Sequence, residues 1–195
     1  MSNLIGMWRA LIFAALLASC AAPVSVIHGV PNLHQFRSNY YRSGQPADTD
    51  EAWAYLRSLG ITDVFKLTFE EEGTDNRAAA HGITVHRVPI DPTSEVLMQV
   101  AAFGLREVLR PSAAVVAEID RLIREVRDDG KGRVVLIQCL HGLDRTGFTS
   151  GRVLVWNGDM TKEQAWAYML RTGFRRVHLG LVREWEAFNP RVGGE

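Results

Sequence analysis

The chain has 195 residues, of which 47% are hydrophobic and 23% are charged. These proportions, with 17 glycines and 7 prolines, exclude a disordered chain, a collagen-like repeat and a disulfide-dense scaffold. The 22 basic and 22 acidic side chains balance, so the charge gives no indication of nucleic-acid binding. The length suits one domain with a sizeable core.

Residues 1–20 have the pattern of an export signal: Arg9 precedes an apolar run over residues 10–18, and the segment ends at Cys20. The run is too short to span a bilayer. Small residues before a cysteine resemble the signal of a bacterial lipoprotein, in which the cysteine takes a lipid and becomes the mature N-terminus. Two alternatives stay open. Simple cleavage near Ala18 gives a soluble exported protein, and a buried N-terminal helix involves no export.

The lipoprotein resemblance implies a location and a membrane partner. A lipid on Cys20 would anchor the chain at the periplasmic face of a bacterial membrane, and Ala21 after the cysteine fits the outer membrane better than the inner one. Residues 21–31 are then expected to form a tether, and residues 32–195 a single domain. Cys139 keeps no partner for a disulfide, so a thiol in an oxidising compartment needs another explanation.

Short strands and helices alternate along the rest of the chain. The first half predicts strands over 32–37 and 40–43, a helix capped by Asp48 and ending at Gly60, a strand over 61–67, a short helix over 76–81 and a strand over 83–88. The second half predicts a helix from Pro111 to about 129, a strand over 133–138, and helices starting near Thr146, at Thr161 and in 182–188. This alternation predicts an α/β fold with a central, mainly parallel twisted sheet flanked by helices.

Two further predictions concern less regular features. Residues 92–110 are expected to form a helical insertion beside the functional site. The tryptophans of the helical segments are expected to be core residues rather than ligand platforms, because large aromatic side chains are mostly buried. They are Trp53, Trp156, Trp166 and Trp185.

One segment places a cysteine at the end of the apolar strand and an arginine six residues later, where a helix opens: Cys139-Leu140-His141-Gly142-Leu143-Asp144-Arg145-Thr146-Gly147. Backbone N–H groups at a helix N-terminus bind an oxyanion. The planar fork of Arg145 can hold two phosphate oxygens, and Gly142 permits a tight turn. Positive surroundings favour a thiolate at Cys139, to which Thr146 can donate a hydrogen bond. The segment therefore predicts a phosphate-binding loop with a cysteine nucleophile.

This loop resembles the C-x5-R-[ST] motif of the cysteine-dependent protein tyrosine and dual-specificity phosphatases. Residues 40–46, YYRSGQP, are similar to the opening of small bacterial and fungal members, and the resemblance extends over about residues 32–188. It implies a dual-specificity-phosphatase-like fold and hydrolysis of a phosphate ester in two steps through a phosphocysteine, with no metal and no other cofactor. One departure is Gln138, where the family often has His.

The resemblance also implies a role for each residue of the loop. Cys139 is the expected nucleophile, Arg145 is expected to bind phosphate during catalysis, and Thr146 is expected to support the thiolate. The phosphate-binding N–H groups are expected to be those of Leu140, His141, Gly142, Leu143, Asp144 and Arg145.

A carboxylic acid must protonate the leaving oxygen, and the sequence offers two main candidates. Asp91 follows a predicted strand end, where the family usually carries its acid, although an Asp before Pro is also a common turn residue. Asp144 lies inside the loop, where some lipid-directed and bacterial relatives use an Asp, although a structural role is equally open to it. Glu95 is a third candidate.

The resemblance implies an exported phosphatase that acts on phosphotyrosine in proteins, with phosphoserine and phosphothreonine as further substrates. Inositol phosphates or phosphoinositides are alternative substrates, because His141 and Asp144 in the loop are compatible with them. The glycine and the Arg-Thr-Gly ending of the loop disfavour sulfur transfer of the rhodanese type. A catalytically inactive phosphate-binding module is the non-enzymatic alternative. The expected partner is thus a phosphorylated protein or small molecule, and not a nucleic acid.

Overall fold

The computed structural model of the protein describes residues 25–91 and 111–190. The predicted export signal with Cys20, the first part of the tether, and the insertion at 92–110 with Glu95 lie outside these ranges. In the part of the chain that is described, no helix is both long and apolar enough to cross a membrane.

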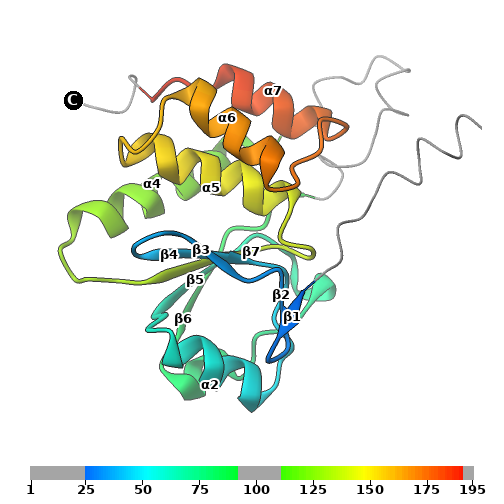
Figure 1. Ribbon diagram of the computed structural model, residues 1–195, viewed down its shortest axis with the longest axis vertical. Coiled ribbons are helices and arrows are strands. Elements are labelled where there is room, and N and C mark those ends of the chain that lie inside the picture. Colours follow the sequence, from blue (N-terminus) through cyan, green and yellow to red (C-terminus); the bar gives the residue numbers. More distant parts are fainter. Residues whose placement is uncertain (1–24, 92–110, 191–195) are drawn as a thin grey trace, which may run out of the picture.

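A five-stranded sheet forms the centre of the domain, in the order β3-β4-β7-β5-β6 (Figure 1). Its strands are β3 (His34–Arg37), β4 (Tyr40–Ser43), β5 (Asp63–Lys66), β6 (Thr84–Arg87) and β7 (Val135–Gln138). β3 pairs antiparallel with β4, and the other neighbours are parallel, so the prediction of a mainly parallel sheet is confirmed. A hairpin of β1 (Val26–Ile27) and β2 (Val30–Pro31) precedes the sheet, within the residues predicted as tether.

Helices cover both faces of the sheet (Figure 1). One face carries α2 (Asp50–Ser58) and the short η2 (Ala78–His81), and the other carries α4 (Ala113–Asp128), α5 (Asp144–Trp156), α6 (Lys162–Arg171) and α7 (Leu179–Ala187). The single-turn helix η1 (Glu70–Glu72) follows β5 directly. These elements confirm the predicted helices to within a few residues at each end.

The cap of α2 corrects one sequence expectation. Thr49, and not Asp48, caps this helix, because the Thr49 hydroxyl accepts the hydrogen bond from an amide of the first turn. The Asp48 carboxylate instead accepts hydrogen bonds from Trp53 Nε1 at 3.0 Å and from the backbone amide of Asn76 at 3.2 Å. Asp48 therefore joins α2 to the segment before η2, a tertiary contact that the local pattern does not reveal.

The central strand β7 is buried on both sides. Val135 and Ile137 belong to the apolar cluster on the side of α4 to α7, whereas Leu136 faces the cluster on the side of α2. Successive side chains of a strand point to opposite faces, so a central strand needs the continuous apolar run that this segment has. The tryptophans pack in or against these clusters, as predicted: Trp53, Trp156, Trp166 and Trp185.

The carboxyl ends of β4, β7 and β5 lie side by side at one edge of the sheet. Gln138, the last residue of β7, is in register with Ser43 of β4 and with Lys66 of β5. The segments that follow the three strands therefore start next to one another. The loop that begins at Cys139 lies between the other two segments.

Candidate active site

The loop over residues 139–145 connects the end of β7 to the start of α5. Cys139 directly follows β7 and is a buried free thiol, 3% exposed. Helix α5 starts at Asp144, two residues earlier than predicted, so Arg145 lies in its first turn, where it is 2% exposed. The expected nucleophile and the expected phosphate-binding arginine thus lie at the two ends of one tight loop at a helix N-terminus, a place where anions bind.

The carbonyl groups of the loop are bound from outside. Three consecutive carbonyls accept hydrogen bonds: Leu140 O from the amide of Gln45 (3.2 Å), His141 O from Asn32 Nδ2 (2.9 Å) and Gly142 O from Arg42 Nη2 (2.7 Å). In a trans peptide, the C=O of one residue and the N–H of the next point in opposite directions. The N–H groups of residues 141–143 therefore point to the inner side of the loop, the orientation that phosphate binding requires.

Two glycines allow the loop to lie directly against the end of β4. Gly142 has a φ of 73°, and a Cβ there would lie 2.4 Å from the backbone nitrogen of Gly44. A Cβ on Gly44 would in turn lie 3.1 Å from the carbonyl oxygen of Leu140. The YYRSGQP segment therefore has a structural task in this chain, because it supplies Arg42 and Gln45 as donors and Gly44 as the close contact.

The side chain of Arg145 is held by a residue that the sequence analysis missed, Glu72 at the end of η1. Arg145 Nη1 and Nη2 donate to the two carboxylate oxygens of Glu72 at 2.8 and 2.5 Å. Nη1 also donates to the carbonyls of Leu67 at 3.2 Å and Ile90 at 3.3 Å. Burial alone raises the pKa of Glu72, but hydrogen bonds from Arg145 and from the amide of Phe69 outweigh burial and lower it. The only signal in the sequence was a run of three glutamates after a predicted strand.

Two buried polar side chains have no hydrogen-bond partner within the described residues, the hydroxyl of Thr146 in the first turn of α5 and the amide of Gln138, which precedes Cys139. The Thr146 hydroxyl is therefore available to donate to a thiolate, in line with its predicted role. Gln138 points to the opposite face of the sheet from Ile137, because neighbours on a strand alternate. It carries no charge at the position where the family often has His.

The carboxylate of Asp144 is buried and forms an ion pair with Arg175, whose side chain is about half exposed. Asp144 is 3% exposed, accepts hydrogen bonds from Arg175 Nη2 at 2.5 Å and from the Arg175 amide at 2.9 Å, and lies 3.1 Å from His178 Nε2. Burial alone raises the pKa of Asp144, but the bonds from His178 and Arg175 outweigh burial and lower it. A carboxyl group held ionised in this way is a poor proton donor near neutral pH.

The other predicted acid, Asp91, is exposed and lies at the edge of the described residues. The carbonyl of the preceding residue, Ile90, accepts a hydrogen bond from Arg145, which brings the backbone of Asp91 beside the loop. The negative charge of Asp91 acts to raise the pKa of Glu72, against the stronger effect of the hydrogen bond from Arg145. Of the two predicted acids, Asp91 is therefore exposed and follows a residue whose carbonyl binds Arg145, whereas Asp144 is buried and paired with Arg175.

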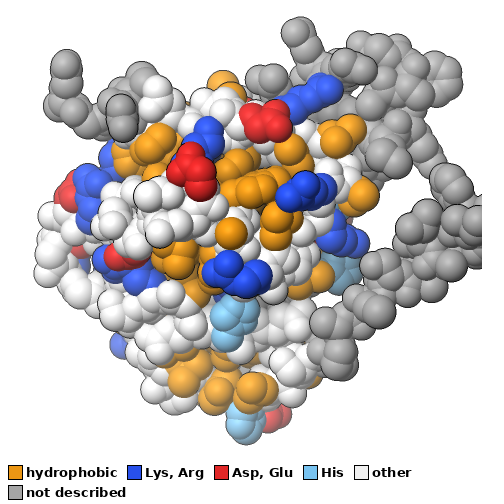
Figure 2. Space-filling model, turned by 45° about the horizontal axis from the view of Figure 1, so that its top comes forward, with side chains coloured by type: hydrophobic (Ala, Val, Ile, Leu, Met, Phe, Trp, Pro, Cys, Tyr) orange, Lys and Arg blue, Asp and Glu red, His pale blue; other side chains and the backbone are white. Residues whose placement is uncertain are grey.

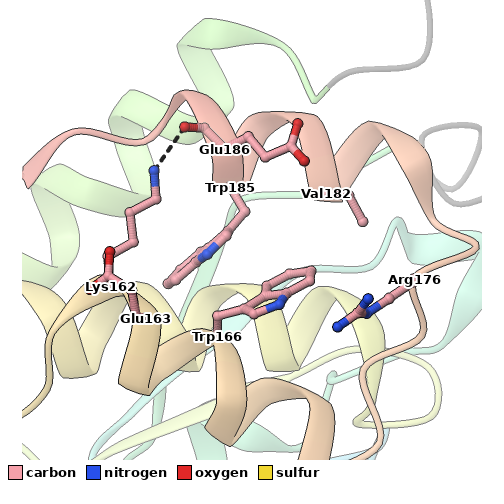
Figure 3. Close-up of a pocket in the computed structure, with 7 residues that line it drawn as sticks. All are labelled: Lys162, Glu163, Trp166, Arg176, Val182, Trp185 and Glu186. Atoms are coloured by element: carbon pink, nitrogen blue, oxygen red, sulfur yellow. Dashed lines mark hydrogen bonds between the residues drawn. The ribbon is translucent and has the colours of Figure 1, made fainter.

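A hollow of about 490 Å³ lies between α6 and α7, away from the loop. Figure 2 shows hydrophobic side chains gathered over these helices, with charged side chains around them. The indole rings of Trp166 and Trp185 lie 6.3 Å apart, and Arg176 lies over the ring of Trp166 (Figure 3). Lys162 donates to the backbone carbonyl of Glu186. These contacts serve the packing of the helices, and no residue of the loop lines the hollow.

Comparisons with known proteins agree with the geometry of the loop. A family model described as the tyrosine phosphatase family matches residues 32–171. In a direct comparison of sequences, no curated protein matches the chain. The match to the family model contains the loop and the YYRSGQP segment that supports it.

Solved structures with the same fold share little sequence with the chain. TpbA from P. aeruginosa is 18% identical, with a TM-score of 0.60 over 90% of this chain and 95% of that one. The core catalytic domain of the PP-IP phosphatase SIW14 from S. cerevisiae is 18% identical, with a TM-score of 0.60 over 85% and 89%. PTPMT1, solved in complex with PI(5)P, is 13% identical, with a TM-score of 0.58 over 80% and 94%. At these identities the likeness shows a common fold.

Proposed function

Because the chain belongs to the tyrosine phosphatase family, we propose that this phosphatase removes phosphate from phosphotyrosine in proteins, and also from phosphoserine and phosphothreonine. The observation that carries the proposal is the loop from Cys139 to Arg145. Its carbonyls are bound from outside, its N–H groups point inward, and its arginine is held in place by Glu72. Such a loop can surround a phosphate group with N–H donors.

In the first step, the thiolate of Cys139 attacks phosphorus and forms a phosphocysteine. The bond from phosphorus to the tyrosyl oxygen breaks, and the carboxyl group of Asp91 gives its proton to that oxygen. The N–H groups of the loop and the guanidinium of Arg145 bind the non-bridging oxygens throughout. Their hydrogen bonds stabilise the charge on these oxygens in the transition state.

In the second step, water attacks the phosphocysteine and Asp91 takes a proton from that water. Inorganic phosphate and the Cys139 thiolate are released, and the hydroxyl of Thr146 stabilises the thiolate as it leaves. Asp91 is preferred to Asp144 as the acid because the carboxylate of Asp144 is buried against Arg175 and has a lowered pKa.

Inositol phosphates and phosphoinositides are the alternative substrates. SIW14 is described as a PP-IP phosphatase, and PTPMT1 has been solved with PI(5)P. The charge beside the loop of this chain favours the phosphoprotein instead. In the segment that reaches Arg145, Glu70 and Glu72 are paired with cations, whereas Glu71 is exposed and would repel a substrate that carries several phosphates.

The experiment that tests this function is hydrolysis, with EDTA present, of a phosphotyrosine peptide, a phosphoserine peptide and an inositol polyphosphate. Wild type and Cys139→Ser are compared. We expect turnover of the peptides by the wild type, and loss of turnover with retained vanadate binding in the variant. Turnover of the inositol polyphosphate alone would support the alternative substrates. Vanadate binding without turnover of any substrate by the wild type would support the inactive binding module.

We also propose that a lipid on Cys20 anchors the enzyme at the periplasmic face of a bacterial membrane, preferably the outer one. The amide of Asn32 donates to Ser25 O at 2.7 Å, and the Asn32 side chain donates to the loop at His141 O. The five residues from Cys20 to Ser25 span at most about 18 Å, so the anchor would keep the loop near the membrane. Cys20→Ala should move the protein to the soluble fraction, and continued membrane association would contradict the anchor.

A further inference from the structure

The hairpin of β1 and β2 exposes two consecutive apolar side chains that the proposed mechanism does not use. Val26 is 59% exposed and Ile27 is 43% exposed. Successive side chains of a strand point to opposite faces, so a strand that packs on one face buries every second side chain. The partner strand β2 does this, because its Val30 is fully buried. β1, in contrast, presents apolar side chains to the surroundings on both of its faces.

The hairpin is held firmly in this position. Its turn has a φ of 47° at His28 and 76° at Gly29, the left-handed conformation at both positions that a tight two-residue hairpin turn requires. The amide of Ala47 donates to Gly29 O at 2.9 Å, and the amide of Gly44 donates to Pro31 O at 2.7 Å. The two apolar side chains of β1 are therefore fixed in an outward orientation.

The hairpin lies beside the phosphate-binding loop, at the same end of the sheet (Figure 1). Asn32 connects the two. Its amide donates to Ser25 O, the residue before β1, at 2.7 Å, and its side chain donates to His141 O in the loop at 2.9 Å. A surface that contacts β1 therefore also lies close to the entrance of the loop.

The other exposed large apolar side chains of the described residues gather at the same end of the molecule. They are Phe69, Leu140 and Val177. Leu140 belongs to the loop, Phe69 directly precedes η1 after β5, and Val177 precedes His178, whose ring lies 3.1 Å from Asp144. Single exposed apolar side chains are ordinary, but their collection at one end of a molecule marks an interaction surface.

The tether indicates what this surface meets. Cys20 is six residues before Val26, so a lipid on Cys20 would lie at most about 22 Å from β1. A bilayer that holds the lipid is then the nearest large apolar phase. Aliphatic side chains gain free energy when they leave water for such an interface.

We propose that Val26 and Ile27 contact the lipid bilayer and, together with the lipid on Cys20, orient the enzyme with its phosphate-binding loop toward the membrane surface. The lipid alone would leave the domain able to rotate about its tether, whereas a second contact at β1 fixes the orientation. The loop would then act on phosphate groups at the membrane surface. This inference rests on the proposed anchor and does not depend on which phosphate ester is the substrate.

The first test measures which end of the sheet lies against the bilayer. The same fluorophore is attached at Ile27→Cys or at Lys131→Cys in the lipid-modified chain carrying Cys139→Ser, and each protein is placed in phosphatidylcholine vesicles with a nitroxide-labelled lipid as quencher. Lys131 is an exposed residue shortly before β7, so it lies at the opposite end of that strand from the loop. We expect severalfold stronger quenching at position 27. Equal quenching at the two positions would overturn the proposal.

The second test uses the double variant Val26→Ser/Ile27→Ser with Cys139 in place. Its kcat/KM for a phosphotyrosine peptide anchored in the same vesicles should fall by about 10-fold, because two half-exposed aliphatic side chains no longer hold the orientation. Its activity on soluble p-nitrophenyl phosphate should stay near that of wild type. An unchanged rate on the anchored peptide would overturn the proposal.

The matched control repeats both serine substitutions in a Cys20→Ala chain, where they should have no effect on either substrate. A 10-fold loss that persists without the anchor would overturn the proposal, because Val26 and Ile27 would then contact the peptide and not the bilayer. A dimer of the Cys20→Ala chain that the serine substitutions dissociate would also overturn it, because a second copy would then cover β1.

The outcomes separate this inference from the proposals on which it rests. Wild type found in the soluble fraction would overturn both the anchor and the orientation. A membrane-bound chain with equal quenching at both positions would overturn the orientation alone. Failure of wild type on phosphotyrosine peptides would contradict the proposed substrate, while the comparison of quenching at Ile27→Cys and Lys131→Cys would still decide the orientation.

Discussion

The loop is supported from two sides, and the two supports differ in kind. On the β4 side, fully buried Arg42 donates to the carbonyl of Gly142 at 2.7 Å and to Thr172 Oγ1 at 2.6 Å, so the acceptors are neutral. On the β5 side, carboxylates meet cations, with Glu72 against Arg145 and Glu70 against Lys66. The first support acts on the backbone of the loop, and the second acts on one of its side chains.

This difference separates two requirements of phosphate binding. The N–H groups must converge, which the β4 side achieves by holding the carbonyls outward. The guanidinium must also face the same centre, which the β5 side achieves by holding one edge of Arg145. Variants of the first support should therefore disturb the whole loop, whereas variants of the second should mainly weaken phosphate binding.

The largest effect is expected from Gly142→Ala, which disrupts the close contact between the loop and the end of β4. The new Cβ would lie 2.4 Å from the backbone of Gly44 and would strain a residue with φ of 73°. Displacing a catalytic loop by about 1 Å costs about 100-fold in rate, so kcat/KM for p-nitrophenyl phosphate should fall at least that far. Gly158→Ala is the matched control, because Gly158 has the same φ and no atom within 4 Å of the added Cβ. Equal activity of the two variants would contradict the close contact.

The next largest effect is expected from Asp91, the proposed acid. Asp91 follows Ile90, whose carbonyl accepts a hydrogen bond from Arg145. Asp91→Asn should lower kcat by about 100- to 1,000-fold on a phenyl phosphate with a poor leaving group. It should have much less effect on p-nitrophenyl phosphate, whose phenol leaves without a proton. Asp144→Asn should show no such contrast and should instead lower the urea midpoint, because it breaks the ion pair with Arg175. A leaving-group contrast in Asp144→Asn alone would reverse the assignment.

Arg42→Met should have a smaller effect on activity than Asp91→Asn has on poor leaving groups. It keeps most of the buried volume but removes the donor to the Gly142 carbonyl and, at 3.4 Å, to the Leu143 carbonyl. We expect kcat/KM to fall by about 10- to 100-fold, since a misplaced loop loses transition-state contacts. Arg37→Met, which breaks a surface ion pair with Asp159, is the control and should stay near wild type. A pure KM effect in Arg42→Met would contradict the division between the two supports.

The smallest effect is expected in the pH dependence of the free energy of unfolding. The β5 side, with its ion pairs, should contribute more to this dependence than the β4 side, whose acceptors are neutral. The pKa of Glu72 is lower in the folded protein than in the unfolded chain. Glu72 therefore stabilises the folded protein above its pKa in the unfolded chain, and this stabilisation is lost as the pH falls through its pKa in the folded protein. Glu72→Gln should therefore be less stable than wild type by about 1 kcal/mol at pH 7, and the two urea midpoints should converge below about pH 4. Arg42→Met should keep its offset from wild type over the same range, because its acceptors carry no charge.

The sequence by itself determined the fold class and the two ends of the loop. The apolar segment 133–138 predicts a buried strand, and the segment from Cys139 to Arg145 predicts a tight loop that leads into a helix. Both are local features, because hydrophobic periodicity and turn chemistry act over a few neighbouring residues. The similarity of YYRSGQP to known members indicated the family, whereas the contact of this segment with the loop is seen only in the structure.

Only the tertiary structure decided which side chains meet. Glu72 reaches Arg145 across 73 residues, and Asp144 pairs with Arg175 across 31, so neither partner follows from spacing along the chain. The two carboxylates proposed as acids look equivalent in sequence, yet Asp144 is buried and Asp91 is exposed. The reason is physical: ion-pair partners and burial depend on the order of the strands in the sheet, which brings the ends of β4, β7 and β5 together.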